Sequence, residues 1–553
     1  MTHCDTNDRQ TLNDHRHHWR FGQLSAAELM PRLQKVLTAQ DTHAHWQLVW
    51  LNNNGKPVIG LLPRVSWSVH LHSNQQTFDT KAYSTYRVDK TCRDHDNALV
   101  TKYMSYDDWQ EELISYSKIY EKNPSCLVTT NTKDDKPSYH HGLIGFIGYD
   151  IAAHELSPTA NMQQAMQPCA VLGHYDIYLA PDVQMGWILR IEPTDSTVNH
   201  ASLRKSALIL NLIAYLDELD IQLSTIEQPK TPVTPLILKA YWQKRDYQQA
   251  FVKTQTYLRQ GDCYQINLTQ AWRSSFKSNV GNDGQTINNL IDYLPALHRN
   301  TGAPFAGYLA DNPLNRSTLN TNDWKSDSSN SRNNISFELL SCSPELFFTF
   351  TKDTKTATRH IRTKPIKGTI PRGVTIKLDN HYKQQLIDSE KDRAENVMIV
   401  DLLRNDLGKY AKTGSVKVPQ LFEIESFSNV HHMVSTITAE LKDDTHPLAV
   451  LFGSLPAGSI TGTPKKRAVE IISELEMAPR GAYCGTMGYM NFDGSGQWNV
   501  LIRTLQANES LSGAREVSLW AGGGITIASD CDAEYQECLD KVGNLLAVLA
   551  QAN

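Results

Sequence analysis

Apolar and polar positions alternate in short runs over most of the first two hundred residues. Runs of this kind, separated by polar turns, predict β-strands, as at residues 143–149 and 175–179. The pattern then changes to a continuous apolar stretch at residues 207–216, which predicts a long helix. The first part of the chain is therefore expected to contain strands that are followed by a helix.

A proline-rich stretch interrupts this pattern. Residues 227–235 contain Pro229, Pro232 and Pro235 within seven positions. Proline fixes the backbone and favours extended chain, so this stretch predicts a connector. The chain is accordingly divided into a variable polar N-terminal extension at 1–40, a first domain at 41–225, a connector at 226–240 and a second domain at 241–553.

The second domain begins with a clear helical pattern. Tyr247, Phe251 and Leu258 fall on one face of a helix that is predicted to end at Gly261. Further along, residues 312–334 are rich in serine, asparagine and aspartate and nearly free of apolar side chains. This composition cannot build a core, so it predicts a surface insertion.

Composition and charge narrow the class of protein. The chain has 553 residues, of which 40% are hydrophobic and 20% charged, as is typical of globular proteins. The net charge of −5 and the lack of a basic run argue against a general nucleic-acid binder. No apolar run is long enough to span a membrane, and residues 1–20 lack the hydrophobic region of a signal peptide, so a cytoplasmic location is expected. Nine dispersed cysteines without CxxC spacing predict reduced thiols.

Two segments place acidic residues at helical spacing. Asp392 and Glu395 are three positions apart, and so are Glu534 and Glu537, which Lys541 follows one turn later. Residues at this spacing share a helix face. Two such faces could together hold a hard cation such as Mg²⁺, although the spacing alone favours two solvated helix faces.

Two glycine-containing segments suggest contact between backbone and ligand. Residues 456–465, PAGSITGTPK, precede a predicted helix at 467–475, and hydroxyls with backbone amides at a helix start can bind an anion. Residues 522–524 are three glycines that follow an apolar strand predicted at 517–520. Glycines at such a place either let the backbone approach a ligand closely or form a plain loop.

Four single residues are candidates for chemistry. Arg503 is a charge in an apolar strand-like run, so it either pairs within the fold or binds a carboxylate. Glu345 precedes apolar residues that could raise its pKa toward that of a general acid. His432 could polarise a hydroxyl or be an ordinary core histidine, and Lys367 could be a nucleophile or lie in a solvated turn. Together these residues indicate a small, doubly anionic substrate held by a metal, an arginine and backbone amides.

The order of these motifs resembles the chorismate-utilising enzymes of the anthranilate synthase component I type. The matching motifs are GDCYQIN (261–267), SPE (343–345), PIKGT (365–369), KDRAEN (391–396), DLLRND (401–406), HH (431–432), SITGTPK (459–465), IRT (502–504), AGGG (521–524) and AEYQE (533–537). A less specific likeness extends to GFIGYD at residues 145–150. The resemblance implies an α+β fold, in which two antiparallel β-sheets packed with surrounding helices enclose a deep active site.

The resemblance also implies a role for each candidate. The Mg²⁺ ligands would be Glu395 and Glu537, with Asp392 and Glu534 close to them. The enolpyruvyl carboxylate of chorismate would be received by Arg503, Tyr489 and the amides of Gly522, Gly523 and Gly524. The rest of the pocket would be lined by His432, Ser459, Thr461 and Lys541.

Lys367 distinguishes the members of this family. In the subfamily that forms 4-amino-4-deoxychorismate, its counterpart attacks C2 of chorismate, the counterpart of Glu345 protonates the leaving 4-hydroxyl, and ammonia then adds at C4. The resemblance therefore implies this activity, with covalent catalysis by Lys367. Members that form anthranilate carry alanine at this position, and members of the isochorismate or salicylate type use water activated by a different lysine. An inactive, tryptophan-binding regulatory homologue is a further alternative.

Two partners are implied besides chorismate. The sequence has no Gly-x-Cys-x-Gly elbow of a glutaminase, so ammonia is expected from a separate glutamine amidotransferase subunit. Family members often hold tryptophan in their first domain, and residues 51–55 lie in roughly the corresponding region. A bound tryptophan is therefore an open expectation.

Overall fold

The computed structural model of the protein describes most of the chain. The described residues are 18–40, 47–72, 85–93, 98–121, 137–182, 186–192, 207–225, 233–276, 289–311, 337–353, 355–427, 430–509 and 515–551. The predicted surface insertion at 312–334 and the first part of the predicted connector, residues 226–232, lie outside these residues. Within them, no helix is long and apolar enough to cross a membrane, and the seven cysteines are free thiols.

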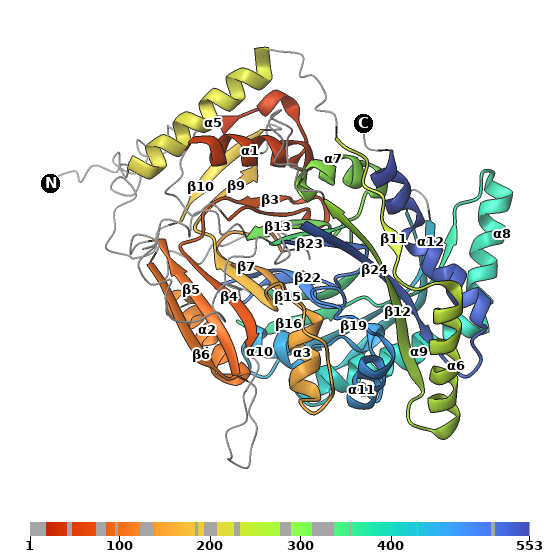
Figure 1. Cartoon of the computed structure of the whole chain (residues 1–553). Coiled ribbons are helices and arrows are strands. Elements are labelled where there is room, and N and C mark those ends of the chain that lie inside the picture. Colours follow the sequence, from red (N-terminus) through yellow and green to blue (C-terminus); the bar gives the residue numbers. More distant parts are fainter. Residues whose placement is uncertain are drawn as a thin grey trace, which may run out of the picture.

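Two antiparallel β-sheets of twelve strands each form the centre of the molecule (Figure 1). The first sheet has the order β1 (His18–Trp19), β10 (Trp187–Ile191), β9 (Ile177–Pro181), β3 (Val58–Gly60), β2 (Val49–Leu51), β13 (Gly307–Asp311), β14 (Phe337–Ser341), β23 (Thr504–Glu509), β24 (Arg515–Ile525), β12 (Gln265–Phe276) and β11 (Lys239–Ala240). The short strand β20 (Gly462–Thr463) pairs with β12 beside this path.

The second sheet carries the other half of the strands. Its order is β17 (Ile366–Pro371), β19 (Val430–Glu440), β16 (Arg359–Thr363), β15 (Leu346–Lys352), β22 (Gly496–Asn499), β21 (Thr486–Asn491), β7 (Gly142–Ile147), β8 (Ala170–His174), β4 (Val65–His72), β5 (Thr85–Cys92) and β6 (Ala98–Met104), and β18 (Lys417–Ser426) pairs with β19. The predicted α+β fold of two antiparallel sheets is therefore confirmed.

Both sheets mix strands from the two ends of the chain. In the first sheet β2 pairs with β13, and in the second β7 pairs with β21. Each sheet thus runs without a break across the predicted boundary at residues 226–240. The two predicted domains therefore share both sheets.

Apolar side chains of both sheets meet in the layer between them. This inner core includes Val49 and Leu309 from the first sheet, and Phe146 and Met487 from the second. All four are at most 1% exposed. Since sheet faces pack about 10 Å apart through such interdigitated side chains, this layer fixes how the two sheets lie on each other.

Helices cover the outer faces of the sheets. The first sheet packs against α1 (Ala26–Gln40), α5 (Ala207–Thr225), α6 (Lys244–Gln260), α7 (Leu290–Thr301), α11 (Lys465–Leu475) and α12 (Cys531–Ala550). The second sheet packs against α2 (Tyr106–Glu121), α3 (Tyr149–Leu156), α9 (Glu390–Gly408) and α10 (Pro447–Ser454). The helix α8 (Ile376–Ile387) lies against β17 and is largely exposed.

Several predicted elements are observed. The apolar stretch at 207–216 forms the first half of α5, and Tyr247, Phe251 and Leu258 are buried along α6. Gly261 ends α6 in the left-handed conformation, with φ of 81°, which glycine adopts at little cost. The signal for α6 combines helical periodicity with a stop residue, whereas α5 was predicted from its continuous apolar stretch alone.

The prediction of a variable polar N-terminal extension is wrong for residues 18–40. Leu29, Leu33 and Leu37 are fully buried along α1, which packs on α5 and α7. Their spacing of four places them on one helix face, so this segment belongs to the outer core of the first sheet. Residues 1–17 lie outside the described part of the chain.

Candidate active site

Lys367 lies on β17 at an irregular point of the second sheet. The pairing of β17 with β19 shifts register between Ile366 and Thr369, which is the mark of a β-bulge. Gly368 has φ of 79°, and a Cβ at this position would lie 2.9 Å from Cγ of Asp392. The bulge therefore requires glycine and redirects the neighbouring lysine, whose Nζ lies 3.2 Å from Oε2 of Glu395.

Glu345 lies in the loop from β14 to β15, next to this lysine. Its backbone is fixed on both sides, because its N–H donates to Ser343 Oγ and its carbonyl accepts from the Val500 N–H. The side chain is only 8% exposed, and burial raises the pKa of its carboxyl to about 7. The opposing positive charges come from Lys367, Lys541 and Arg503. A carboxyl that titrates near neutral pH, surrounded by cations, can serve as a general acid.

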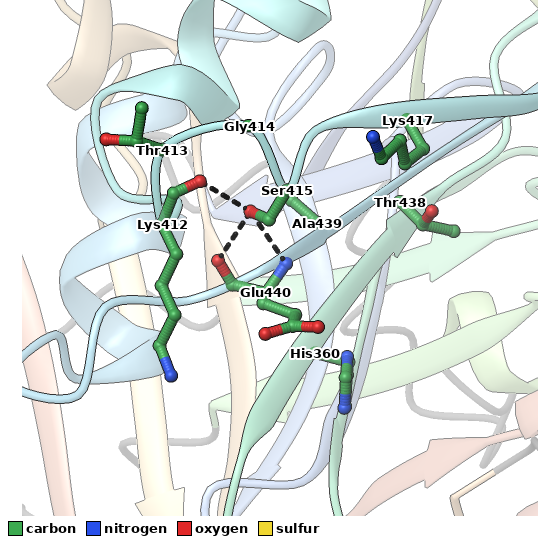
Figure 2. A pocket seen from close by; sticks show the side chains of 9 residues that line it. All are labelled: His360, Lys412, Thr413, Gly414, Ser415, Lys417, Thr438, Ala439 and Glu440. Atoms are coloured by element: carbon green, nitrogen blue, oxygen red, sulfur yellow. Dashed lines mark hydrogen bonds between the residues drawn. The ribbon is translucent and has the colours of Figure 1, made fainter.

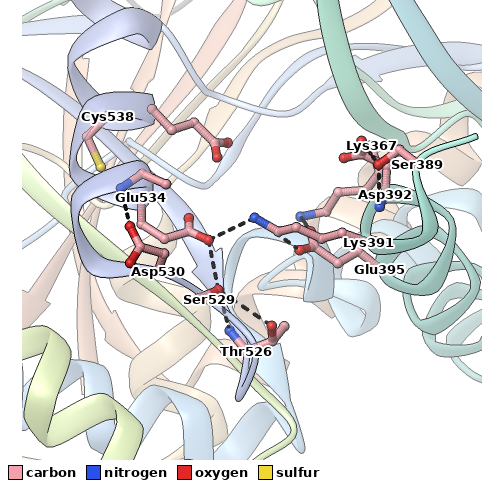
Figure 3. Close-up of polar contacts among 12 residues, drawn as sticks. Lys367, Ser389, Lys391, Asp392, Glu395, Thr526, Ser529, Asp530, Glu534 and Cys538 are labelled. Atoms are coloured by element: carbon pink, nitrogen blue, oxygen red, sulfur yellow. Dashed lines mark hydrogen bonds and ion pairs between the residues drawn. The ribbon is translucent and has the colours of Figure 1, made fainter. Parts of the chain in front are cut away.

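The two predicted acidic faces are on helices, α9 and α12, that face each other (Figure 3). Lys391 of α9 donates to Oε1 of Glu534 on α12 at 3.1 Å and lies 4.0 Å from Oε1 of Glu395. The same Glu534 oxygen accepts from Ser529 Oγ at 2.7 Å. Glu395 and Glu534 are thus turned toward one another across the two helices, whereas Glu537 is 46% exposed.

Glu537 and Lys541 extend this group one turn further along α12. Their side chains form an ion pair of 2.7 Å, and Lys541 Nζ also donates to the carbonyl oxygen of Gly522 at 2.9 Å. Burial acts to raise the pKa of Glu537, but the charge and hydrogen bond of Lys541, together with the charges of Lys367 and Lys391, hold the pKa below the usual value. Glu537 is therefore an anion at neutral pH.

Asp392 has a different environment from the other three acids. Its Oδ2 accepts from Ser389 Oγ at 2.6 Å, and its N–H donates to the same hydroxyl at 3.3 Å. Ser389 is the N-cap of α9, so this pair forms a reciprocal cap at the helix start. The structure therefore gives Asp392 a partner within its own helix.

Glu395, Glu534 and Glu537 remain as possible ligands of a divalent cation, and their arrangement suits such an ion in part. No three His, Cys, Asp or Glu side chains within the described ranges are arranged closely enough to hold a metal ion. The carboxylates are instead paired with Lys367, Lys391 and Lys541. However, Oε1 of Glu395 is buried and has no hydrogen-bond partner. An unsatisfied buried carboxylate oxygen is costly, and a hard cation would satisfy it.

His432 and Arg503 lie near the same residues. His432 is 5% exposed, its Nδ1 forms a 2.8 Å hydrogen bond with Thr369 Oγ1, and burial with the charge of Arg503 lowers its pKa to about 4. The imidazole is therefore neutral. Neighbouring His431 is fully buried between Asp379 and Ser426 and belongs to the fold.

The position of Arg503 corrects the prediction that it lies in a strand, and its surroundings support the prediction that it binds a carboxylate. It does not lie within a strand but in the link from β22 to β23, with φ of 52°. Burial lowers the pKa of its guanidinium, and the described part of the chain offers no ion pair to it. A partly buried arginine without a carboxylate partner is suited to a carboxylate of a ligand.

The three glycines lie inside β24, so the loop alternative is wrong. They pair with β12, and a Cβ on Gly523 would lie 2.9 Å from Oε2 of Glu534. Glycine here lets α12 bring its acids against the strand. The nearby turn holds η8 (Gly458–Ile460), in which Ser459 is partly exposed, whereas the Thr461 hydroxyl is fully buried and donates to the Ala457 carbonyl.

Tyr489 is placed away from this group. It belongs to the core between the sheets, and its hydroxyl donates to the carbonyl oxygen of Pro137 at 2.7 Å. Its ring packs edge-on against Tyr139. Its hydroxyl is therefore already used within the fold, and the structure does not bring it together with Arg503 as predicted.

A separate hollow of about 480 Å³ lies elsewhere, on the face of β18 and β19 (Figure 2). Its lining is His360, Lys412, Thr413, Gly414, Ser415, Lys417, Thr438, Ala439 and Glu440. The Ser415 hydroxyl is bound to backbone groups of Lys412 and Glu440, and Lys412 pairs with Asp443. None of the predicted site residues lines this hollow.

Two features of the site escaped the sequence analysis. Lys391 lies within the matched KDRAEN motif but received no role, because it needs the opposite helix to reveal its partner. The bulge at Lys367 could have been suspected from the following glycine, since an isolated glycine in a strand often marks one.

Comparison with known proteins gives a consistent result. The family model described as chorismate binding enzyme matches residues 83–547. The aminodeoxychorismate synthase component 1 of Salmonella typhimurium is 36% identical over 414 residues, which cover 74% of this chain and 76% of that protein. The anthranilate synthase component 1 of Aquifex aeolicus is 29% identical over 416 residues, which cover 75% of each.

Solved structures agree in fold. The anthranilate synthase component I of Streptococcus pneumoniae aligns with a TM-score of 0.60 and 20% identity, over 95% of this chain and 98% of that chain. MenF, the menaquinone-specific isochorismate synthase of Escherichia coli, aligns with a TM-score of 0.53 and 16% identity, over 95% of this chain and 100% of that chain. At these identities the alignments establish the shared fold and nothing further.

Proposed function

Because the chain belongs to the family of chorismate binding enzymes, we propose that it converts chorismate and ammonia to 4-amino-4-deoxychorismate. This reaction would place it in 4-aminobenzoate and folate biosynthesis. The proposal is supported by relatives named aminodeoxychorismate synthase component 1, which are 35–36% identical over about three quarters of the chain.

The position of Lys367 carries the proposal. Its neutral amine would attack C2 of chorismate, both ring double bonds would shift, and the 4-hydroxyl would leave as water with a proton from Glu345. Ammonia would then add at C4, both double bonds would shift back, and the lysine amine would leave. One difficult substitution is thereby divided into two easier ones. The raised pKa of Glu345 supports its role, because the protonated form is then available near neutral pH.

The charges of the site suit the two carboxylates of chorismate. Arg503 and the amides of the glycine strand β24 would receive the enolpyruvyl carboxylate. We infer that the ring carboxylate is met by Mg²⁺ held by Glu395, Glu534 and Glu537. The ion would supply positive charge where two anions meet. The buried, unsatisfied oxygen of Glu395 supports this assignment.

Charge-neutral variants test the metal ligands. In Glu395→Gln and Glu537→Gln the concentration of Mg²⁺ that gives half-maximal activity should rise at least roughly tenfold, because a carboxylate ligand is lost. The comparison requires steady-state rates over a wide range of Mg²⁺. If both variants keep the wild-type Mg²⁺ dependence, the metal assignment is wrong.

Two further partners belong to the proposal. The names of the relatives contain component 1, which implies a partner component, and we infer that this is a glutamine amidotransferase that supplies ammonia. A cytoplasmic location is part of the same inference. Tryptophan fits less well, because the cavity beside Leu51 and Asn53 has a volume of only about 20 Å³, which suits one water molecule and no indole.

The product of the reaction decides the proposal. The full-length protein is incubated with chorismate, Mg²⁺ and ammonium, and the product is identified by mass spectrometry. We expect 4-amino-4-deoxychorismate with its pyruvyl group retained. Anthranilate with pyruvate would overturn the proposal, and no turnover together with tight tryptophan binding would indicate a regulatory homologue.

A further inference from the structure

Lys391 occupies an unusual place between the two acid-bearing helices. Its Nζ donates to Glu534 at 3.1 Å and lies 4.0 Å from the oxygen of Glu395 that has no hydrogen-bond partner. Among the residues that the structure describes, this is the one side-chain hydrogen bond that joins α9 to α12 (Figure 3). A single ammonium thus lies between carboxylates of both helices.

The carboxylates themselves cannot move away easily. The Glu534 side chain is 2% exposed, is bound by Ser529, and lies against Gly523, where a Cβ would be 2.9 Å from its Oε2. Glu395 is 9% exposed and is held by Lys367 at its other oxygen. The acids therefore form a fixed cradle.

Lys391 is the mobile member of this group. Its side chain is 50% exposed, so the ammonium reaches the cradle from the solvent side. A lysine has four rotatable bonds in its side chain, and a half-exposed one can turn to water at small cost. A lysine amine is protonated at neutral pH, so the group is a full cation.

We propose that Lys391 is a tethered counter-ion that fills the cation position between Glu395 and Glu534 and must be displaced when Mg²⁺ binds. The proposal rests on the proposed metal site. It assigns Lys391 the role of a positioning residue that keeps α9 and α12 together when no metal is bound. The same ammonium weakens the affinity of the protein for Mg²⁺. Two cations about 4 Å apart repel strongly in a partly buried site, so both cannot occupy the cradle.

The test is Mg²⁺ binding to the full-length protein without chorismate. Lys391→Met keeps the aliphatic stem and removes the charge, and Lys391→Gln serves as a second variant in case the first folds poorly. By isothermal titration with MgCl₂ alone, both should bind Mg²⁺ roughly tenfold more tightly than the wild type, because the competing charge is gone. Thermal unfolding should show a larger stabilisation by Mg²⁺ in the variants than in the wild type.

Lys409→Met is the matched control. Lys409 lies on the same helix, is 55% exposed and pairs with a buried carboxylate, that of Asp406, at 3.4 Å. Its substitution should leave the Mg²⁺ affinity unchanged. Unchanged or weaker Mg²⁺ binding in both Lys391 variants would overturn the counter-ion role while leaving the proposed activity intact. No Mg²⁺ binding by any form would overturn this inference together with the metal site, and the identity of the product would still test the proposed reaction.

Discussion

Two buried ion clusters lie in the second half of the chain, and they differ in how completely their atoms are paired. In the first, Arg480 and Glu476 are 2% and 5% exposed, and the guanidinium donates to both carboxylate oxygens and to the carbonyl oxygens of Ile460 and Asn267. Glu476 also accepts from Thr269. In this cluster the guanidinium nitrogens and the carboxylate oxygens all have hydrogen-bond partners within the fold.

The second cluster, around Lys367, is incomplete. One oxygen of Glu395 has no hydrogen-bond partner, and Arg503 has no carboxylate among the described residues. Buried charges are normally paired, since unpaired ones are costly. A cluster that pairs all its polar atoms stabilises the fold, whereas one that leaves a carboxylate oxygen without a hydrogen bond and an arginine without a carboxylate is prepared for a ligand.

The largest effect is expected for Lys367→Ala, which removes the proposed nucleophile from the incomplete cluster. Formation of 4-amino-4-deoxychorismate should fall by at least about a thousandfold, because the covalent route is lost. The chain should still unfold cooperatively near the wild-type temperature. Product analysis by mass spectrometry and a thermal melt measure the two properties, and a variant that keeps its activity would remove Lys367 from the chemistry.

Arg480→Met, in the fully paired cluster, is expected to lower the stability of the fold, whereas Lys367→Ala should leave it nearly unchanged. Glu476 would remain buried without its counter-charge, so the free energy of unfolding should fall by about 3–5 kcal/mol. Urea denaturation measures this loss. In the double variant Arg480→Met, Glu476→Met much of the stability should return, because no buried charge is left. If Arg480→Met alone keeps the wild-type stability, the pairing of atoms does not distinguish the two clusters.

Glu345 tests the incomplete cluster through pH. If the protonated carboxyl is the general acid, activity should fall about tenfold per pH unit above about pH 7, where the group with a pKa of about 7 loses its proton. Glu345→Gln should lower kcat by about 10²–10⁴-fold and remove this limb of the profile. A variant that keeps the same alkaline limb would assign it to another group.

The same pKa predicts the direction of a stability change. In the unfolded chain a glutamate has a pKa of about 4.3, whereas burial raises it to about 7 in the folded protein. Between these values the folded state holds the proton and the unfolded state does not, so the contribution of Glu345 to stability falls as pH rises. Glu345→Gln should flatten this part of the curve of stability against pH.

The sequence predicted the elements better than the contacts between them. The helix α5 follows from a continuous apolar stretch, α6 follows from periodicity and a glycine stop, and both acid-bearing helices follow from spacing. Sequence spacing could not show that α9 and α12 face each other, because they are more than 120 residues apart and are brought together by the sheets. For the same reason Lys391 had no visible partner.

Two expectations differ from the structure for a common physical reason. The role of Tyr489 was implied by the family resemblance, and a loop at residues 522–524 was one of two alternatives for the three glycines. The structure places Tyr489 between the sheets, where its hydroxyl binds the Pro137 carbonyl, and places the glycines in β24 because α12 packs against them. In both cases packing from a distant element decides the environment.

The smallest effect is expected for Asp392→Asn. This variant tests whether Asp392 belongs to the paired acids or to the metal ligands. Its carboxylate is already bound by Ser389 at the start of α9, where a negative charge interacts favourably with the helix dipole. Asparagine keeps an acceptor but loses the charge, so the free energy of unfolding should fall by about 0.3–1 kcal/mol. The affinity for Mg²⁺ should stay within about twofold of the wild type, unlike that of Glu395→Gln, because a ligand already paired within its own helix adds little. Urea denaturation and titration with MgCl₂ measure both quantities, and a tenfold loss of Mg²⁺ affinity would move Asp392 from the paired acids to the metal ligands.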